Sequence, residues 1–294
     1  MKFSVVIPLY NKAEHVVNAL NSVLNQSDTD FEVIVVDDAS TDEGVQRVLE
    51  IDHPKVKVIE RSKPGPGGYL ARNYGVTHST GDWITFLDAD DTWEPDHLAN
   101  FRQLAIKYPD AKFLTSGYKL INETSVVEVS VGDDRVLSGC ESIKLILWRD
   151  FIHTNTVCID RDLYAAAGGF NVDRNWTRGG DSEFWFRLIG IAKLTAFSGK
   201  ITSTWILDHS EITRKKIPID KRHPVLEAID VEIPRSMYCC KRIVRLYAWR
   251  KQLSWYLSMG YSGPVLFRVL LVLVSYPEII FEAASRLLLR RKRS

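Results

Sequence analysis

The chain has 294 residues, which is enough for one large α/β domain or two smaller ones, and either would bury a substantial core. Its hydrophobic fraction of 45% and charged fraction of 26% are ordinary for a globular protein. The four cysteines include no Cys-x-x-Cys pair, which argues against a zinc ribbon or a disulfide framework and fits a reducing cytosol, and the apolar run in MKFSVVIPLY is too short for a secretory signal.

Short apolar runs alternate with helix-like segments in the first part of the chain. Strands are predicted at 3–7, 31–36, 56–60 and 82–87, and helices at 11–25, 42–50 and 69–79. Such alternation, with strands that are almost wholly apolar, favours an α/β fold with a mainly parallel sheet and helices on both faces. Beyond Pro109 the pattern is mixed, and we expect a strand near 112–118, a hairpin around 124–137 and a short strand at 155–159.

Polar residues follow three of these predicted strands. Pro8 and Tyr10 follow the first strand, Asp38 the second, and Asp88 and Asp90 the fourth. Because ligands of open α/β sheets bind beyond the carboxyl ends of the strands, these residues predict a site at that edge. The glycine patterns that cradle phosphates in dinucleotide-binding and P-loop folds are absent from the sequence.

The stretch DWITFLDADDTW places Asp88, Asp90 and Asp91 within four positions. Carboxylates that close together repel one another unless a cation lies among them. Hard oxygen ligands suit Mg²⁺ or Mn²⁺, and such a metal commonly binds one or two carboxylates together with substrate phosphates. The alternative is a helix N-cap at Asp91 or Thr92, which leaves Asp88 unexplained.

A second acidic position lies in RGGDSEFWFRL, residues 178–188. Asp181 follows two glycines and opens a predicted helix, so it is a candidate N-cap. It is equally a candidate general base, because one carboxylate facing a reacting hydroxyl is what that role needs. The two interpretations are compatible.

Six motifs, in this order, resemble the family-2 inverting glycosyltransferases of the GT-A fold, which is a Rossmann-like α/β fold. They are VVIPLYN (5–11), VVDDASTD (35–42), ARNYG (71–75), FLDADD (86–91), GGF (168–170) and GGDSEFWFRL (179–188). The resemblance covers roughly residues 3–215. It implies that Pro8, Tyr10 and Asp38 bind the nucleoside of a nucleotide-sugar donor, with Arg72 and Asn73 nearby.

The same resemblance assigns the reacting groups. Asp88 would face the ribose, Asp90 would bind the Mg²⁺ or Mn²⁺ ion, and Asp181 would be the catalytic base. The family usually has Glu-Asp at the base motif, whereas Gly180 precedes Asp181 here. His209, in WILDHSEIT, resembles a family histidine near the diphosphate, and a surface histidine is the alternative.

The expected organisation is a catalytic domain at 1–215, with a nucleotide-binding half at about 1–110 and an acceptor half at about 111–215, followed by a basic helical region at 216–294. The expected function is transfer of a sugar from a nucleotide sugar, with a UDP-sugar as the expected donor, to a hydroxyl of a glycan or lipid-linked saccharide. The alternative is a nucleotidyltransferase or a non-catalytic nucleotide-binding protein on a similar sheet.

The C-terminal segment is strongly basic. Residues 241–294 hold eleven Lys and Arg against Glu278 and Glu282, although the whole chain has a net charge of only +1. The apolar stretch 265–289 is interrupted by charges and Pro277, so we expect helices that lie on an anionic membrane surface rather than span it. The alternative is a helical subdomain packed on the catalytic domain or on a dimer partner. No nucleic-acid-binding module is recognisable.

This segment therefore predicts a location as well as a partner. We expect a cytoplasmic protein attached peripherally to the inner face of the cell membrane through residues 241–294.

Overall fold

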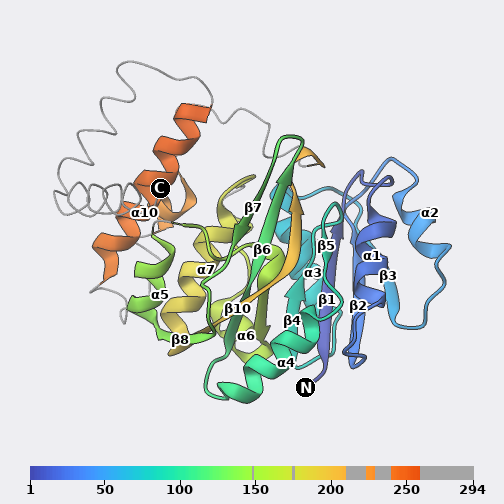
Figure 1. The fold of residues 1–294 in the computed structure, drawn as a ribbon. Helices are drawn as coiled ribbons and strands as arrows, with labels where there is room; N and C mark the ends of the chain where they lie inside the picture. The colour runs from blue at the N-terminus through green and yellow to red at the C-terminus, as the bar shows by residue number, and fades with distance from the viewer. Residues whose placement is uncertain (148, 174–175, 210–222, 229–239, 259–294) are drawn as a thin grey trace.

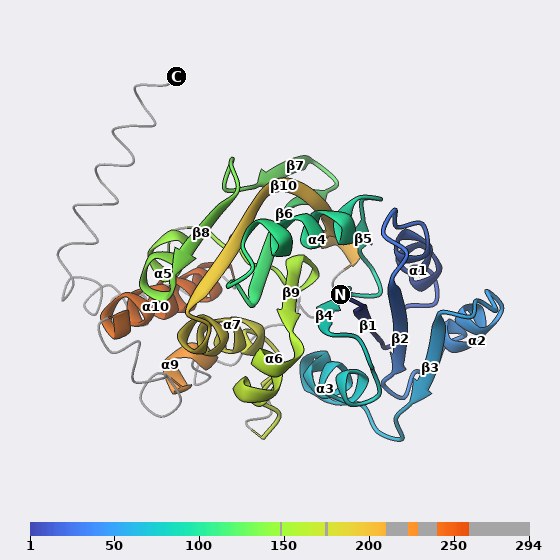
Figure 2. The same ribbon diagram turned by 90° about the horizontal axis from the view of Figure 1, so that it is seen from below.

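A computed structural model of the chain describes residues 1–147, 149–173, 176–209, 223–228 and 240–258. In these residues the strands form one curved sheet in the order β3-β2-β1-β4-β9-β6-β10-β5, with β7 added to β6 and β8 to β10 (Figures 1 and 2). The strands are β1 (Phe3–Leu9), β2 (Phe31–Asp37), β3 (Val56–Glu60), β4 (Trp83–Phe86), β5 (Thr92–Trp93), β6 (Phe113–Asn122), β7 (Ser125–Val129), β8 (Arg135–Ser138), β9 (Val157–Asp160) and β10 (Leu194–Ile206).

Helices cover both faces of this sheet. They are α1 (Val16–Leu24), α2 (Gly44–Leu49), α3 (Tyr69–Thr77), α4 (His97–Lys107), α5 (Gly139–Ile146), α6 (Arg161–Ala167), α7 (Gly180–Ile191), α9 (Pro224–Ala228) and α10 (Lys241–Ser258), with short 3₁₀ turns η1 (Pro66–Gly68), η2 (Thr154–Thr156) and η3 (Leu207–His209). Figure 2 shows α1 and α4 on one side of the sheet and α3, α6 and α7 on the other. Each side has its own apolar core, as expected for an α/β sheet covered on both faces.

The parallel arrangement is limited to part of the sheet. Strands β3, β2, β1 and β4 pair in parallel, as do β6 and β10, whereas β9 runs antiparallel to both β4 and β6. The prediction of a mainly parallel sheet is therefore correct for the first four strands, whereas most pairs beyond them are antiparallel and only β6 and β10 pair in parallel. The β6–β7 hairpin and the reversed strand β9 need no strand–helix–strand crossover, because antiparallel pairing does not require one.

Two local predictions near the site are also wrong. Thr92 and Trp93 form β5 against β10, and α4 begins only at His97, so neither Asp91 nor Thr92 caps a helix. The hairpin expected around 124–137 does not form, because β7 pairs with β6 and β8 pairs with β10. Both β5 and β8 pair with β10, which is distant in sequence, and the local sequence pattern does not indicate this pairing.

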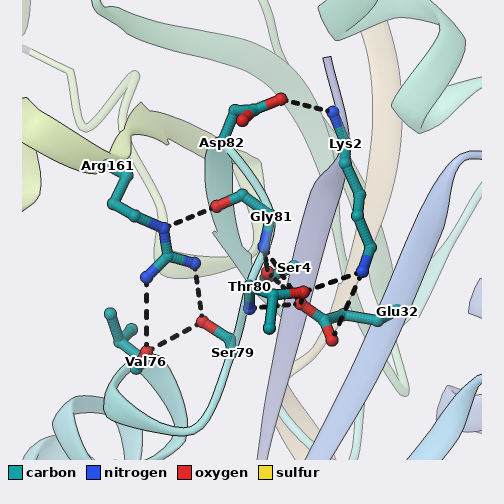
Figure 3. Close-up of polar contacts among 9 residues, drawn as sticks. All are labelled: Lys2, Ser4, Glu32, Val76, Ser79, Thr80, Gly81, Asp82 and Arg161. Atoms are coloured by element: carbon teal, nitrogen blue, oxygen red, sulfur yellow. Dashed lines mark hydrogen bonds and ion pairs between the residues drawn. The ribbon is translucent and has the colours of Figure 1, made fainter.

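A network of polar contacts fixes the amino-terminal edge of the sheet (Figure 3). The carboxylate of Glu32 accepts hydrogen bonds from the Ser4 hydroxyl at 2.8 Å and from the Gly81 amide at 3.0 Å, and Arg161 donates to the Gly81 carbonyl at 2.6 Å. These contacts hold the loop between α3 and β4. They therefore set where β4 begins, and so where its other end delivers Asp88.

The C-terminal helix α10 packs against the helices on one face of the sheet. Val244, Tyr247 and Ala248 are buried in the same core as residues of α7, and α10 lies beside α5 and α9 (Figures 1 and 2). A disulfide joins Cys140 to Cys240, so the expectation against disulfides is wrong for this pair. The two cysteines are 100 positions apart, and their spacing does not indicate the bond. Residues 241–258 therefore pack on the rest of the protein, as in the alternative of a packed helical subdomain.

Within the described residues, no helix is both long enough and apolar enough to cross a membrane. The predicted apolar stretch 265–289 lies outside the described residues, as does the basic end of the chain.

Candidate active site

The loop after β2 places Asp38 beneath the glycine-rich loop that precedes α3. Asp38 is only 3% exposed; its carboxylate accepts the Gly65 amide hydrogen at 2.9 Å and pairs with the Arg61 guanidinium. Burial raises the pKa of Asp38 above its ordinary value, although Gly65 and Arg61 oppose that shift. Asp38 thus ties the carboxyl end of β2 to the loop that leads into α3.

Arg72 is the cation that accompanies Asp88. It lies in α3, is 6% exposed, and forms an ion pair with Asp88, which follows β4. The Asp88 amide donates to the side-chain oxygen of Asn155 at 2.9 Å. An apolar strand can therefore end on Asp88 because a buried arginine compensates the carboxylate.

Asp91 has a structural role that differs from the predicted N-cap. Its carboxylate is 2% exposed and accepts hydrogen bonds from the Asn155 amide at 2.5 Å and the Ile206 backbone N–H at 2.7 Å. Burial, followed by the charges of Asp90 and Asp88, raises the pKa of Asp91 well above its usual value. Asn155, which the sequence did not single out, thus positions both Asp88 and Asp91.

Asp90 belongs to a neighbouring cluster of basic groups. Its carboxylate lies 3.0 Å from the Lys12 ammonium, which also donates to the His209 carbonyl. The His209 ring stacks on His15 with centroids 3.9 Å apart, and its Nδ1 lies 3.4 Å from the Asp90 carbonyl oxygen. Burial and the nearby Asp88 raise the pKa of Asp90.

Asp90 is the candidate ligand for a divalent cation. In the described part of the chain, no group of three or more His, Cys, Asp and Glu side chains is arranged to hold a metal. Mg²⁺ nevertheless binds through one or two carboxylates when substrate phosphates complete its shell. Asp90 with His209 fits that mode of binding, provided that Lys12 leaves the carboxylate.

Asp181 lies in the first turn of α7. The N-cap of this helix is Gly179, with φ of 81°, so the predicted capping role of Asp181 is wrong. A carboxylate in a first helical turn is stabilised by the positive end of the helix dipole. Asp181 is therefore held near a helix N-terminus without being used as its cap.

Asp181, Asp88 and Arg72 line one pocket of about 230 Å³. Its wall also includes side chains that the sequence did not single out: Tyr69, Tyr118, Asp150, His153, Arg178, Trp205, His223, Tyr247, Lys251 and Trp255. The pocket thus joins carboxylates, cations and aromatic rings from both halves of the sheet, the composition expected of a ligand site. No local pattern marks these residues, because they meet only through the fold.

Six predicted site residues lie outside the lining of this pocket: Asp38, Asp90 and His209, described above, and Pro8, Tyr10 and Asn73. Tyr10 is 48% exposed just after β1, and Pro8 is half-buried within β1. Asn73 is occupied elsewhere: its amide donates to the Phe170 carbonyl at 2.8 Å and its oxygen accepts from the Tyr164 hydroxyl at 2.6 Å. Asn73 thus holds the GGF turn in place, and Pro8 and Tyr10 remain predicted donor contacts.

Comparison with known proteins identifies the domain. Residues 4–126 match the family described as Glycosyl transferase family 2. The chain contains a family-2 glycosyltransferase domain. The match includes Asp38, Arg72, Asp88 and Asp90, whereas Asp181 lies beyond the matched residues.

Relatives of this glycosyltransferase domain differ in how much of their length they share with it. The chain is 42% identical over 101 residues to an uncharacterised glycosyltransferase of Nostoc sp., covering 33% of this chain and 31% of that protein. It is 29% identical over 221 residues to UDP-Glc:alpha-D-GlcNAc-diphosphoundecaprenol beta-1,3-glucosyltransferase WfgD of Escherichia coli, covering 74% of this chain and 82% of WfgD. The chain thus spans about a third of the first relative and most of the second.

Solved structures establish the fold of the glycosyltransferase domain. S. aureus TarS in complex with UDP superposes with a TM-score of 0.67 at 21% identity, covering 88% of this chain and 72% of that chain. Mannosyltransferase PcManGT from Pyrobaculum calidifontis, in complex with GDP-Man and Mn²⁺, gives 0.62 at 19% identity, covering 98% and 80%. The mixed α/β, GT-A-like fold is therefore confirmed.

The glycine before Asp181 has a structural reason in this fold. A Cβ atom at Gly180 would lie only 2.9 Å from the ring of Tyr69, whose hydroxyl accepts the Gly180 amide hydrogen at 3.0 Å. Contacts that short do not occur for real Cβ atoms without movement of a neighbour. Tyr69, packed in this position, excludes the glutamate that the motif usually has.

Proposed function

We propose that this protein transfers a sugar from a nucleotide sugar to a hydroxyl group of a glycan or lipid-linked saccharide, with inversion at the anomeric carbon. The observation that carries this proposal is the shared pocket of Asp181, Asp88 and Arg72. A carboxylate beside a compensated ion pair suits a general base next to a bound donor. The family-2 domain favours this reaction over the nucleotidyltransferase and binding-only alternatives.

The proposed chemistry is a single displacement. The Asp181 carboxylate takes the proton of the acceptor hydroxyl while that oxygen forms a bond to the anomeric carbon. The bond from this carbon to the donor's phosphate oxygen breaks, and its electron pair leaves with the nucleoside diphosphate. Attack from the face opposite the leaving group inverts the configuration. Arg72, held by Asp88, would add positive charge to the donor side of the pocket.

A divalent cation is part of the proposal, supported by the Mn²⁺ in the PcManGT structure. Asp90, with His209 beside it, would hold Mg²⁺ or Mn²⁺. When bound, the ion neutralises charge on the departing diphosphate. Lys12 would leave Asp90 and remain close enough to contact a phosphate group.

A UDP-sugar is the proposed donor, because TarS was solved with UDP and the name of WfgD specifies UDP-Glc. A panel of UDP-, GDP-, ADP- and dTDP-sugars, assayed by release of the nucleoside diphosphate, tests this choice. We expect release of UDP from a UDP-sugar. Without an acceptor, water takes the place of the acceptor hydroxyl and this release is slow. Turnover confined to GDP-sugars would contradict the donor but leave the transferase intact, whereas no release and no nucleotide binding would contradict the proposed function.

A lipid-linked acceptor and a peripheral location on the inner face of the cell membrane are also proposed. They rest on the basic residues of 241–294 and on the diphosphoundecaprenol acceptor named for WfgD. Each Lys or Arg near an anionic surface contributes about 1 kcal/mol to attachment. The apolar side chains of α10 are buried in the protein core, so we assign attachment to the membrane mainly to residues 259–294.

Flotation with liposomes tests the attachment. The full chain is expected to float with vesicles containing anionic phospholipid and to stay in solution with neutral vesicles. A chain ending at Ser258, which keeps α10 and the Cys140–Cys240 bond, is the matched control and is expected to stay in solution with both. Equal flotation of the two chains, or no flotation of the full chain, would contradict the proposed role of residues 259–294.

A further inference from the structure

The pocket continues beyond Asp181 to a wall that lies outside the expected catalytic domain. That wall consists of Tyr247, Lys251 and Trp255 from α10, together with His223 just before α9. Residues after 215 therefore enclose the same space as the proposed base. The proposed transfer requires a second substrate next to Asp181, and this wall is one side of the space available to it.

The α10 wall is fixed relative to Asp181. Asp150 binds Lys251 at 2.7 Å and Arg250 at 3.3 Å, and the Tyr247 hydroxyl lies 3.2 Å from its carboxylate. The same Tyr247 hydroxyl lies 3.3 Å from the hydroxyl of Ser182, the residue after Asp181. A side chain on this face of α10 thus keeps a defined position relative to the base.

His223 provides a hydrogen-bond donor that no described residue uses. Its Nδ1 accepts the Val225 amide hydrogen at 3.2 Å, so the hydrogen of the neutral ring is on Nε2. Burial lowers the pKa of His223 well below its ordinary value, which keeps the ring neutral. His223 is fully buried, and across the described residues its Nε2 has no hydrogen-bond partner. An unpaired buried donor of this kind is costly unless a ligand supplies an acceptor.

The unused donor lies close to the reacting group. A Cβ atom at Gly179 would lie 3.1 Å from Nε2 of His223, and Gly179 is two residues before Asp181. Gly179 also has a φ of 81°, which favours glycine, so the short approach between the ring and the backbone depends on this residue. Because His223 and Asp181 line the same pocket, a molecule bound there can contact both.

Another part of the pocket lining is aromatic. The rings of Trp205 and His153 stack with centroids 4.5 Å apart, and Tyr118 lies 5.4 Å from His153. The charged side chains of the lining are balanced, with three cations and three carboxylates: Arg72, Arg178, Lys251, Asp88, Asp150 and Asp181. Balanced charge with aromatic faces suits an uncharged ligand that has both hydroxyl groups and apolar C–H faces, which is the chemistry of a saccharide.

We propose that this half of the pocket is the subsite for the acceptor saccharide, in which His223 Nε2–H donates to a sugar oxygen and Trp205 contacts a sugar face. This inference rests on the proposed function and deepens it. The C-terminal region would thereby be part of the active site, because His223 and α10 enclose the acceptor.

A pair of substitutions at one position tests the donor. His223→Asn keeps an acceptor for the Val225 amide but removes the distal N–H, whereas His223→Gln keeps a distal N–H. The probes are methyl glycosides of glucose and N-acetylglucosamine, titrated in the presence of saturating UDP and followed by saturation-transfer NMR. We expect wild type and His223→Gln to bind a probe with similar affinity and His223→Asn to bind it about 10-fold more weakly. Affinity for UDP is expected to stay within about 2-fold in all three.

Further variants separate a binding role from a packing role. Trp205 is half-buried in the aromatic part of the lining, and Trp205→Ala is expected to weaken probe binding by a similar factor. Arg242 is exposed on α10 and outside the pocket lining, and Arg242→Met is expected to leave probe binding unchanged. Thermal unfolding of each variant identifies any loss of fold. Binding of UDP without binding of any methyl glycoside by wild type, or unchanged affinity in both His223→Asn and Trp205→Ala, would overturn the subsite. Absence of binding to every nucleotide would instead contradict the proposed function.

Discussion

Replacement of Asp181 by Asn is expected to abolish sugar transfer while the fold and the nucleotide affinity stay close to normal. Asn has nearly the same size and shape but no basic oxygen to take the acceptor's proton, and general-base assistance contributes roughly 10²–10⁴-fold to rate. Gly179, not Asp181, caps α7, so the substitution removes no cap. The expected loss therefore falls on kcat for transfer, with thermal unfolding and UDP titration almost unchanged.

Transfer rates with a matched control distinguish this role from a general effect of charge. Asp162 is an exposed carboxylate in the first turn of α6, so Asp162→Asn removes an equivalent charge from an equivalent helical position outside the pocket. It is expected to retain wild-type transfer. Turnover of Asp181→Asn within a few-fold of wild type would show that Asp181 is not the base. Loss of UDP affinity together with turnover would show that it acts on the donor instead.

Strands and helices of the first half were predictable because their signals are local. Each of β1 to β4 is an apolar run of a few residues, and three strand ends deliver Pro8, Asp38 and Asp88 to one edge by geometry alone. Boundaries were less predictable: the helix expected from residue 11 begins at Val16. Predictions for the second half of the chain were wrong where a strand pairs with a partner distant in sequence, as β5 does with β10.

The candidate site shows the same division between local and distant information. A cluster of carboxylates predicted a nearby cation, and in the structure a basic side chain pairs with two of them: Arg72 with Asp88 and Lys12 with Asp90. No sequence pattern predicts either of these two ion pairs. The wall formed by His223 and α10 was equally unpredictable, because a basic helix with an apolar face suits a membrane surface and a packed interface equally well.

Removal of divalent cations is expected to weaken UDP binding, and Asp90→Asn is expected to weaken it to the same level whether or not Mn²⁺ is present. Asp90 supplies the carboxylate for the proposed ion, and the donor's diphosphate supplies the remaining oxygen atoms. Calorimetric titration of UDP in Mn²⁺ and in EDTA measures both effects. Asp110, an exposed carboxylate in the turn after α4, provides the control for charge, and Asp110→Asn is expected to match wild type.

Lys12 allows a second test of the metal site, because its ammonium lies 3.0 Å from the Asp90 carboxylate that would bind the ion. An ion can bind Asp90 only if Lys12 moves, so Lys12→Met is expected to raise the affinity for Mn²⁺ in the absence of nucleotide, measured by electron paramagnetic resonance of free Mn²⁺. The opposite role predicts the opposite result. If Lys12 itself replaces the metal, wild type binds UDP equally well in Mn²⁺ and EDTA, and Lys12→Met loses UDP affinity in both. That pattern would contradict the metal assignment at Asp90 and make Lys12 the cation that faces the diphosphate.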